Sequence, residues 1–162
     1  MGAIKAKTQL EKLGFSETDK KNPKHDTIQT WVYENIEQIL SETVMKNSSE
    51  PYEIISTKWE HQIINHGVYS RTIVGYIDLM VHLKGEFFYK KGDASEPNKQ
   101  IFIEVKTEIP SLGELIRQMR AYQTYAHELT SYLIVSPDDS HKKILNEQGF
   151  YFYKYKDPSL LF

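Results

Sequence analysis

The sequence has no cysteine among its 162 residues, which excludes disulfide bonds and thiolate chemistry and favours an intracellular location. No apolar run reaches the ~18 residues that a membrane-spanning helix requires. The first seven residues also lack the apolar core of a signal peptide. We therefore expect a cytoplasmic protein that does not contact a membrane.

An excess of charge is also missing, because the formal net charge is only −2 with 26% charged residues. A chain that coats itself with nucleic acid is strongly basic, so any phosphate-binding surface here must be local. Apolar residues make up 40% of the chain, an ordinary share for a globular protein. The length and the absence of internal repeats predict a single domain over residues 1–162.

Residues 100–107 form the stretch around which the rest is organised, and they read as a strand. Its apolar face carries Ile101, Ile103 and Val105. Glu104 and Lys106 lie on the opposite face, because side chains alternate along a strand. Ionised groups are rarely buried unless they are paired or bind a metal. A further carboxylate, Asp78, stands in the apolar strand expected over residues 73–83, so we expect a site here.

The remaining patterns predict a mixed α/β fold with a mixed central sheet flanked by helices. The predicted elements are a helix over 3–13, a loop over 16–24, a helix over 26–44, strands over 52–64, 73–83 and 100–107, a helix over 111–128, a strand over 131–136, a short helix over 140–149 and an edge strand over 150–156. Three strands without an intervening helix favour a meander. The strand–helix–strand unit that follows favours a parallel pair. The core spans about residues 25–136, and the segment 140–156 adds to it.

Capping residues set the expected helix boundaries. Asp26 with Gln29, and Ser111 with Glu114, each match a capping box. Ser140 is the expected cap of the last helix. The apolar stripes that follow the first two caps are Ile28, Trp31, Val32, Ile36, Ile39 and Leu40 in the first helix, and Leu112, Leu115, Ile116, Met119, Tyr122 and Ala126 in the second.

The two carboxylates Asp78 and Glu104 come from adjacent strands, where facing side chains approach within a few ångströms. Hard divalent cations such as Mg²⁺ and Mn²⁺ prefer carboxylate oxygens and water. The carbonyl of Val105 is a plausible third ligand. Lys106 projects beside such a cation, where it can orient a water or neutralise a phosphate. These are the components of phosphodiester hydrolysis.

At these residues the sequence resembles the PD-(D/E)xK nuclease superfamily. The resemblance rests on Gly75-Tyr76-Ile77-Asp78, on Ile103-Glu104-Val105-Lys106 and on Gln118 with Tyr122. The last pair is similar to the Gln-x-x-x-Tyr element of the RecB-like branch, which includes Cas4-type exonucleases. The similarity runs from His25 to about Ser136, and it implies a restriction-endonuclease-like core.

By this resemblance, Asp78 and Glu104 bind Mg²⁺ or Mn²⁺ and Lys106 is catalytic. Gln118 and Tyr122 line the site and contact nucleic acid, and His25 is a further metal ligand. The outward-facing Arg117 and Arg120 are expected to bind the nucleic-acid backbone. The rivals of His25 as the last ligand are Glu34, Glu37 and Glu60. Two features depart from the family pattern: no proline precedes Asp78, and without cysteine no iron–sulfur cluster is implied.

We therefore expect a metal-dependent deoxyribonuclease, with RNA as the alternative substrate and with exonuclease and endonuclease action both open. Sequence-specific cleavage by so small a core would need a homodimer or a partner protein. The alternative function is a non-catalytic nucleic-acid-binding or protein-interaction module on a nuclease fold. Taken alone, Glu104 and Lys106 also suit an ion pair on a solvated sheet face, and Gln118 and Tyr122 suit the edge of a core.

Overall fold

A computed structural model describes residues 22–48, 51–85, 98–127 and 129–160. The predicted helix over 3–13 lies outside these residues, as does most of the predicted loop over 16–24. The helices are α2 (Pro23–Glu34), α3 (Ile36–Glu42), α4 (Leu112–Tyr125) and α5 (Lys142–Glu147), with a 3-10 turn η3 (Pro158–Leu160). In the described part of the chain, none of these helices has the length and apolarity needed to cross a membrane.

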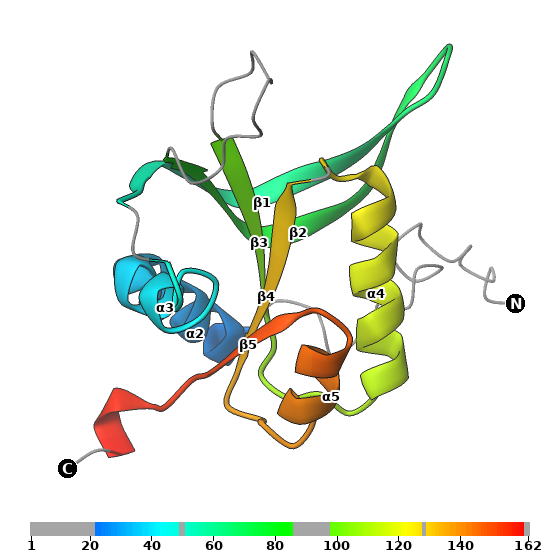
Figure 1. Cartoon of the computed structure of the whole chain (residues 1–162). Helices are drawn as coiled ribbons and strands as arrows, with labels where there is room; N and C mark the ends of the chain where they lie inside the picture. Colours follow the sequence, from blue (N-terminus) through cyan, green and yellow to red (C-terminus); the bar gives the residue numbers. More distant parts are fainter. Residues whose placement is uncertain (1–21, 49–50, 86–97, 128, 161–162) are drawn as a thin grey trace, which may run out of the picture.

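The centre of the molecule is a mixed five-stranded sheet with the strand order β1-β2-β3-β4-β5 (Figure 1). The strands are β1 (Glu53–His66), β2 (Arg71–Lys84), β3 (Asn98–Val105), β4 (Thr130–Ser136) and β5 (Tyr151–Lys154). The pairs β1–β2 and β2–β3 are antiparallel, whereas β3–β4 and β4–β5 are parallel. The predicted meander, the predicted parallel pair and the predicted final edge strand are all confirmed.

Helices cover both faces of this sheet (Figure 1). One core joins α2 and α3 to the sheet and contains Ile103 and Val105 of β3. The other core joins α4 and α5 to the opposite face and contains Phe102. The alternation predicted for β3 is therefore confirmed, and the face that bears Glu104 is the one under α4.

The first helix begins earlier than predicted and is interrupted. Asn22 caps α2, because its side-chain oxygen accepts a hydrogen bond from the His25 amide at 2.9 Å. Pro23 suits the first helical turn, where no amide hydrogen is needed. The predicted cap at Asp26 is wrong, and His25 lies inside the helix. The helix also breaks at Asn35, although the apolar stripe continues into α3.

The predicted cap of α4 is confirmed, because Ser111 Oγ accepts a hydrogen bond from the Glu114 amide at 3.3 Å. The predicted cap of α5 is wrong, since α5 starts at Lys142 with His141 at its cap position. The hydroxyl of Ser140 instead donates to Asp138 Oδ1 at 2.6 Å. Ser140 lies one residue before the cap position of α5.

Strand β1 does not keep a simple alternation of faces. Trp59 stacks on Tyr33 of α2 with ring centroids 4.9 Å apart. His61, two residues on, packs against Phe102 on the opposite face of the sheet. The residue between them, Glu60, has a φ of 50°, in the left-handed region that residues other than glycine rarely adopt. This conformation turns β1 over at Glu60.

Strand β2 turns over at the matching position. Leu79 belongs to the core under α2 and α3, whereas Ile77 belongs to the core under α4. Residues Trp59 and Leu79 are paired, so continuing the register places the reversal in β1 beside Asp78. Asp78 is therefore located where both strands change the face that they present.

Candidate active site

The predicted charged residues meet at the point where the pairing between β2 and β3 ends. Leu79 is paired with Ile103, so one further step of the antiparallel register sets Asp78 opposite Glu104. The exposed fractions are only 9% for Asp78, 4% for Glu104 and 6% for Lys106. The structure thus brings together the three residues that the sequence singled out, in a buried setting.

Asp78 is held through both its side chain and its backbone. Its Oδ2 accepts a hydrogen bond from the Val105 amide at 2.7 Å, and His25 Nε2 lies 3.4 Å from the same oxygen. Gln29 Nε2 donates to the Asp78 carbonyl at 2.9 Å. Helix α2 and strand β3 therefore fix the position of this carboxylate.

Glu104 is held from α4 and from its own strand. Gln118 Nε2 donates to Glu104 Oε1 at 2.8 Å, and Lys106 Nζ lies 3.4 Å from that oxygen. The Lys106 amide donates to the Val135 carbonyl at 2.9 Å, which continues the parallel pairing of β3 with β4 past Val105. The ammonium and the carboxylate accordingly share the face under α4.

Gln118 and Tyr122 form a hydrogen-bonded chain, as their spacing of four residues on α4 allows. Gln118 Nε2 also donates to the Tyr122 hydroxyl at 3.2 Å. That hydroxyl donates to the Tyr76 carbonyl at 3.0 Å. The chain links Glu104 through α4 to β2, so Gln118 supports the carboxylate directly and Tyr122 supports it through Gln118.

His25 is the only one of the candidates for the last ligand that lies in the cluster. It is 6% exposed, whereas Glu34, Glu37 and Glu60 are all exposed. Burial alone would lower the pKa of His25. The ion pair with Asp78, together with the charges of Glu104 and Asp26, outweighs burial and raises the pKa above its usual value.

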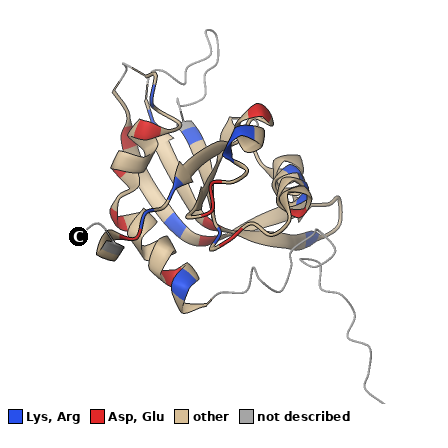
Figure 2. Ribbon diagram, turned by 90° about the horizontal axis from the view of Figure 1, so that it is seen from below, with Lys and Arg blue, Asp and Glu red and all other residues tan. Residues whose placement is uncertain are grey.

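The two predicted arginines are exposed on α4. Arg120 donates to the backbone and side-chain oxygens of Gln148 at 2.9 and 3.0 Å, and its guanidinium lies 4.7 Å from the ring centre of Phe150. It therefore fastens α4 to the segment after α5. Acidic and basic segments are interspersed over the part of the chain drawn in colour in Figure 2, in keeping with the small net charge.

The possible side-chain metal donors in the cluster are two carboxylates, Asp78 and Glu104, and one imidazole, His25. Among the described residues, no three His, Cys, Asp or Glu side chains are grouped tightly enough to hold a metal ion between them. A closed cage of the structural zinc type therefore does not fit. Mg²⁺, by contrast, is often bound by one or two carboxylates and keeps water and substrate phosphate as its other ligands. Asp78 and Glu104 fit that open arrangement.

The sequence analysis missed the contribution of Gln29, which is 3% exposed and holds the Asp78 backbone. It also missed Asp138, whose Oδ2 accepts from the Ile109 amide at 3.0 Å and so ties the segment after Lys106 to the segment after β4. A signal for Gln29 was present, because a polar residue four positions after His25 shares its helix face. No local signal pointed to Asp138.

Comparison with protein-family models, with curated proteins and with solved structures found no match for this chain, so its assignment to a function rests on the geometry of the site.

Proposed function

We propose that this protein is a Mg²⁺- or Mn²⁺-dependent nuclease that hydrolyses phosphodiester bonds in DNA. The observation that carries the proposal is the convergence of Asp78, Glu104 and Lys106, each at most 9% exposed, at the parting of two strands. Burying two carboxylates and an ammonium costs several kcal/mol per ion before pairing repays it. A function that uses their charges accounts for their retention in the interior.

Asp78 and Glu104 are the residues that would hold the cation. When bound, a divalent cation lowers the pKa of a water ligand and stabilises charge on the phosphate. His25 and Gln29 keep Asp78 in place, and Gln118 keeps Glu104 in place.

Lys106 supplies a positive charge on the same face as Glu104. Its Nζ lies 3.4 Å from the Glu104 carboxylate. In this role Lys106 neutralises a phosphate oxygen or orients the attacking water.

The arrangement of the elements supports a restriction-endonuclease-like core. A helix precedes a three-stranded meander, and a helix with a parallel strand follows it. Both carboxylates stand in the second and third strands of that meander, and the Gln-x-x-x-Tyr residues stand in the helix that covers them. The finer family assignment is part of this proposal.

A second candidate is a nucleic-acid-binding module without hydrolysis. The oxygen Asp78 Oδ2 is engaged by Val105 and His25, and Glu104 Oε1 by Gln118 and Lys106. Such mutual pairing also suits a purely structural cluster.

The test is incubation of the purified protein with end-labelled single- and double-stranded DNA and with RNA, in Mg²⁺ or Mn²⁺. We expect cleavage that falls by about 10²–10⁴-fold in Lys106→Ala and in Asp78→Asn. The matched control is Lys58→Ala, which removes an exposed lysine of β1 and should cleave normally. Cleavage that survives both site substitutions would refute this site. A silent calorimetric titration with Mn²⁺, with and without DNA, would favour the second candidate.

A further inference from the structure

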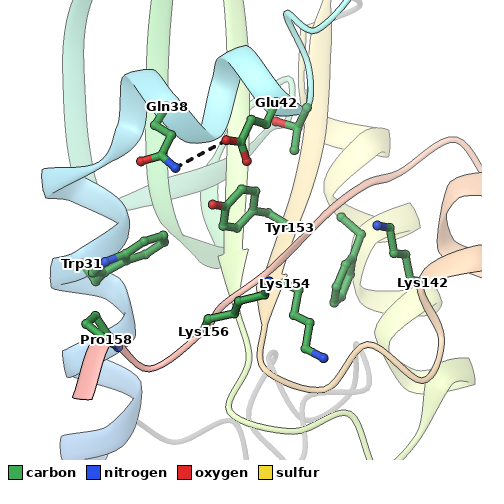
Figure 3. Close-up of a pocket in the computed structure, with 10 residues that line it drawn as sticks. Trp31, Gln38, Glu42, Lys142, Tyr153, Lys154, Lys156 and Pro158 are labelled. Carbon is green, nitrogen blue, oxygen red and sulfur yellow. Dashed lines mark hydrogen bonds between the residues drawn. The ribbon is translucent and has the colours of Figure 1, made fainter. Parts of the chain in front are cut away.

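A second feature lies at the β5 edge of the sheet, between the helices α2 and α3 and the chain from α5 to the residues after β5. It is a hollow of about 630 Å³ (Figure 3). Sites for small ligands commonly have volumes of about 300–1,000 Å³. None of the residues of the buried cluster lines it. It therefore offers a place for a ligand group beside the proposed active site.

One wall of the hollow is aromatic. Trp31 of α2 and Tyr153 of β5 point toward one another, with ring centres 5.9 Å apart (Figure 3). Tyr155 packs edge-on against Trp31 at 5.2 Å and holds that ring in place. Fixed aromatic rings at a surface are the platforms on which unpaired bases stack.

One side of the hollow is basic. Lys142, Lys154 and Lys156 line it, on a chain whose net charge is −2. Lys154 pairs with Asp139 at 3.2 Å, and both side chains are about half exposed. Within the described residues, neither Lys142 nor Lys156 has such a carboxylate partner. These lysines form a local patch that suits phosphate.

The opposite side carries hydrogen-bonding groups. Gln38 Nε2 donates to Glu42 Oε1 at 3.4 Å, and both residues line the hollow. Burial and then the neighbouring Glu42 raise the pKa of Tyr153, so its hydroxyl keeps its proton. An amide and a carboxylate are the groups that read the edges of adenine and cytosine.

From the order of these groups around the hollow, we propose that it binds one nucleotide of a nucleic-acid strand. The phosphates lie against the three lysines, the base lies against Trp31 and Tyr153, and its polar edge faces Gln38 and Glu42. The choice of ligand rests on the proposed function. The lysines suit an anionic group, the aromatic wall suits a flat group, and Gln38 with Glu42 suits a hydrogen-bonding edge. A nucleotide combines all three.

The position of the hollow lets one strand reach both sites. Strands β3, β4 and β5 are parallel, so Lys106 and Lys156 follow strands that end at the same edge of the sheet. Two strand spacings, about 10 Å, separate the ends of β3 and β5, and Lys156 lies two residues beyond the end of β5. Trp31 and His25 are on the same helix, about 9 Å apart along its axis. A strand seated in the hollow thus passes close to Asp78.

The experiment uses the two tryptophans of the chain. In a Trp59→Phe background, Trp31 is the only indole, and its fluorescence is titrated with an unlabelled twelve-nucleotide oligodeoxycytidylate in EDTA. We expect saturable quenching. The dissociation constant should rise at least tenfold in Lys142→Ala/Lys154→Ala/Lys156→Ala, and the slope of log K against log salt should become shallower by about 2.

The matched control removes three exposed lysines elsewhere, Lys46→Ala/Lys58→Ala/Lys84→Ala, for the same change in net charge. It should bind as the background protein does. Equal weakening in both triple variants would overturn the proposal. So would binding of a fluorescein-labelled copy of the oligonucleotide, seen as a rise in its fluorescence anisotropy, if Trp31 fluorescence stays constant when the unlabelled oligonucleotide is added. Inorganic polyphosphate that quenches Trp31 equally would show that no base is bound, which also overturns it.

The outcome is separable from that of the nuclease test. Cleavage that needs Asp78 but is indifferent to the three lysines would overturn the hollow and leave the nuclease intact. Quenching that depends on those lysines, in a protein that never cleaves, would overturn the nuclease proposal and leave the nucleotide-binding hollow intact.

Discussion

The buried side chains of Asp78 and Glu104 each meet donors at one oxygen: Asp78 Oδ2 meets Val105 and His25, and Glu104 Oε1 meets Gln118 and Lys106. Gln118 is the most heavily used of these, since one amide nitrogen reaches both Glu104 and the Tyr122 hydroxyl. Removing one member of such a set leaves another polar group without its partner in the interior, which costs more than the bond itself contributes.

Tyr122→Phe tests this set at a single atom. The hydroxyl donates to the Tyr76 carbonyl and accepts from Gln118, and Tyr122 is fully buried. We expect the free energy of unfolding to fall by about 1–3 kcal/mol in a urea titration. Tyr125→Phe on the same helix is the control, because Tyr125 is exposed and should change little. Equal stability of the two variants would contradict the hydrogen-bonded chain.

Asp138→Asn tests the connection between the segments that follow β3 and β4. Hydrogen bonds from Ser140 and from the Ile109 amide lower the pKa of Asp138 below its usual value. A depressed pKa in the folded state means that the carboxylate stabilises the protein above about pH 3.9 and that this stabilisation is lost as the pH falls through the folded value. We expect a loss of about 1 kcal/mol at pH 7, reduced by partial exposure.

The pH dependence separates this effect from a general loss of packing. Wild-type protein and Asp138→Asn should converge in stability when urea titrations are repeated at successively lower pH. Asp139→Asn makes the same charge change one residue away, in a surface ion pair with Lys154 that contributes little. A constant gap between wild type and Asp138→Asn at every pH would contradict the assignment.

At the residue scale, the sequence predicted the site residues correctly where the alternation of side chains along a strand was sufficient to assign them to a face. It placed Glu104 and Lys106 on one face and added Asp78 from the neighbouring strand. It could not find the hydrogen bond from Gln29 to Asp78, which joins residues 49 apart in the chain. Such a contact depends on how a helix docks on a sheet, and no local pattern encodes that docking.

At the scale of elements, the helix caps show why boundaries are harder to predict than cores. Ser111 caps α4 as expected, because its Oγ accepts from the Glu114 amide. Asn22 displaces the expected cap at Asp26, and α5 begins two residues after Ser140, so that His141 takes its cap position. Both apolar stripes, by contrast, were predicted correctly, although the first is divided between α2 and α3, because burial of a whole face outweighs any single cap.

The reversal of β1 gives a prediction that belongs to this scale. Glu60 holds a left-handed backbone, which costs a residue with a side chain about 1–2 kcal/mol. Glu60→Gly relieves that cost, whereas Lys58→Gly, in ordinary strand conformation, should lose about 0.5–1 kcal/mol. We expect Glu60→Gly to unfold at a higher denaturant concentration than Lys58→Gly, even though the Glu60 side chain makes an interaction of its own. The opposite order in chemical denaturation would argue against strain at Glu60.

At the scale of the whole molecule, the sheet separates two apolar layers that do not share side chains. Val32 belongs to the layer of α2 and α3, and Met119 to the layer of α4 and α5. The sheet lies between these two cores, so Val32 and Met119 do not touch and are not expected to couple directly.

We therefore expect Val32→Ala and Met119→Ala to destabilise additively. Each substitution leaves a cavity in its own layer, costing about 1–2 kcal/mol for Val32→Ala and about 2–5 kcal/mol for Met119→Ala. The double variant should match the sum within about 0.5 kcal/mol when unfolding is followed by circular dichroism. A double variant much less destabilised than the sum would mean that the layers relax together.

The bond between the Val105 amide and the Asp78 carboxylate has a practical consequence. Here a side-chain carboxylate takes the place of the backbone carbonyl that accepts from an amide in a regular sheet. The chemical shift of the Val105 amide proton therefore depends on the charge at Asp78 Oδ2. In a ¹H–¹⁵N correlation spectrum, the Val105 cross-peak therefore serves as a built-in gauge of whatever approaches Asp78, and its displacement during a Mn²⁺-free Mg²⁺ titration can be followed without any label beyond the isotope.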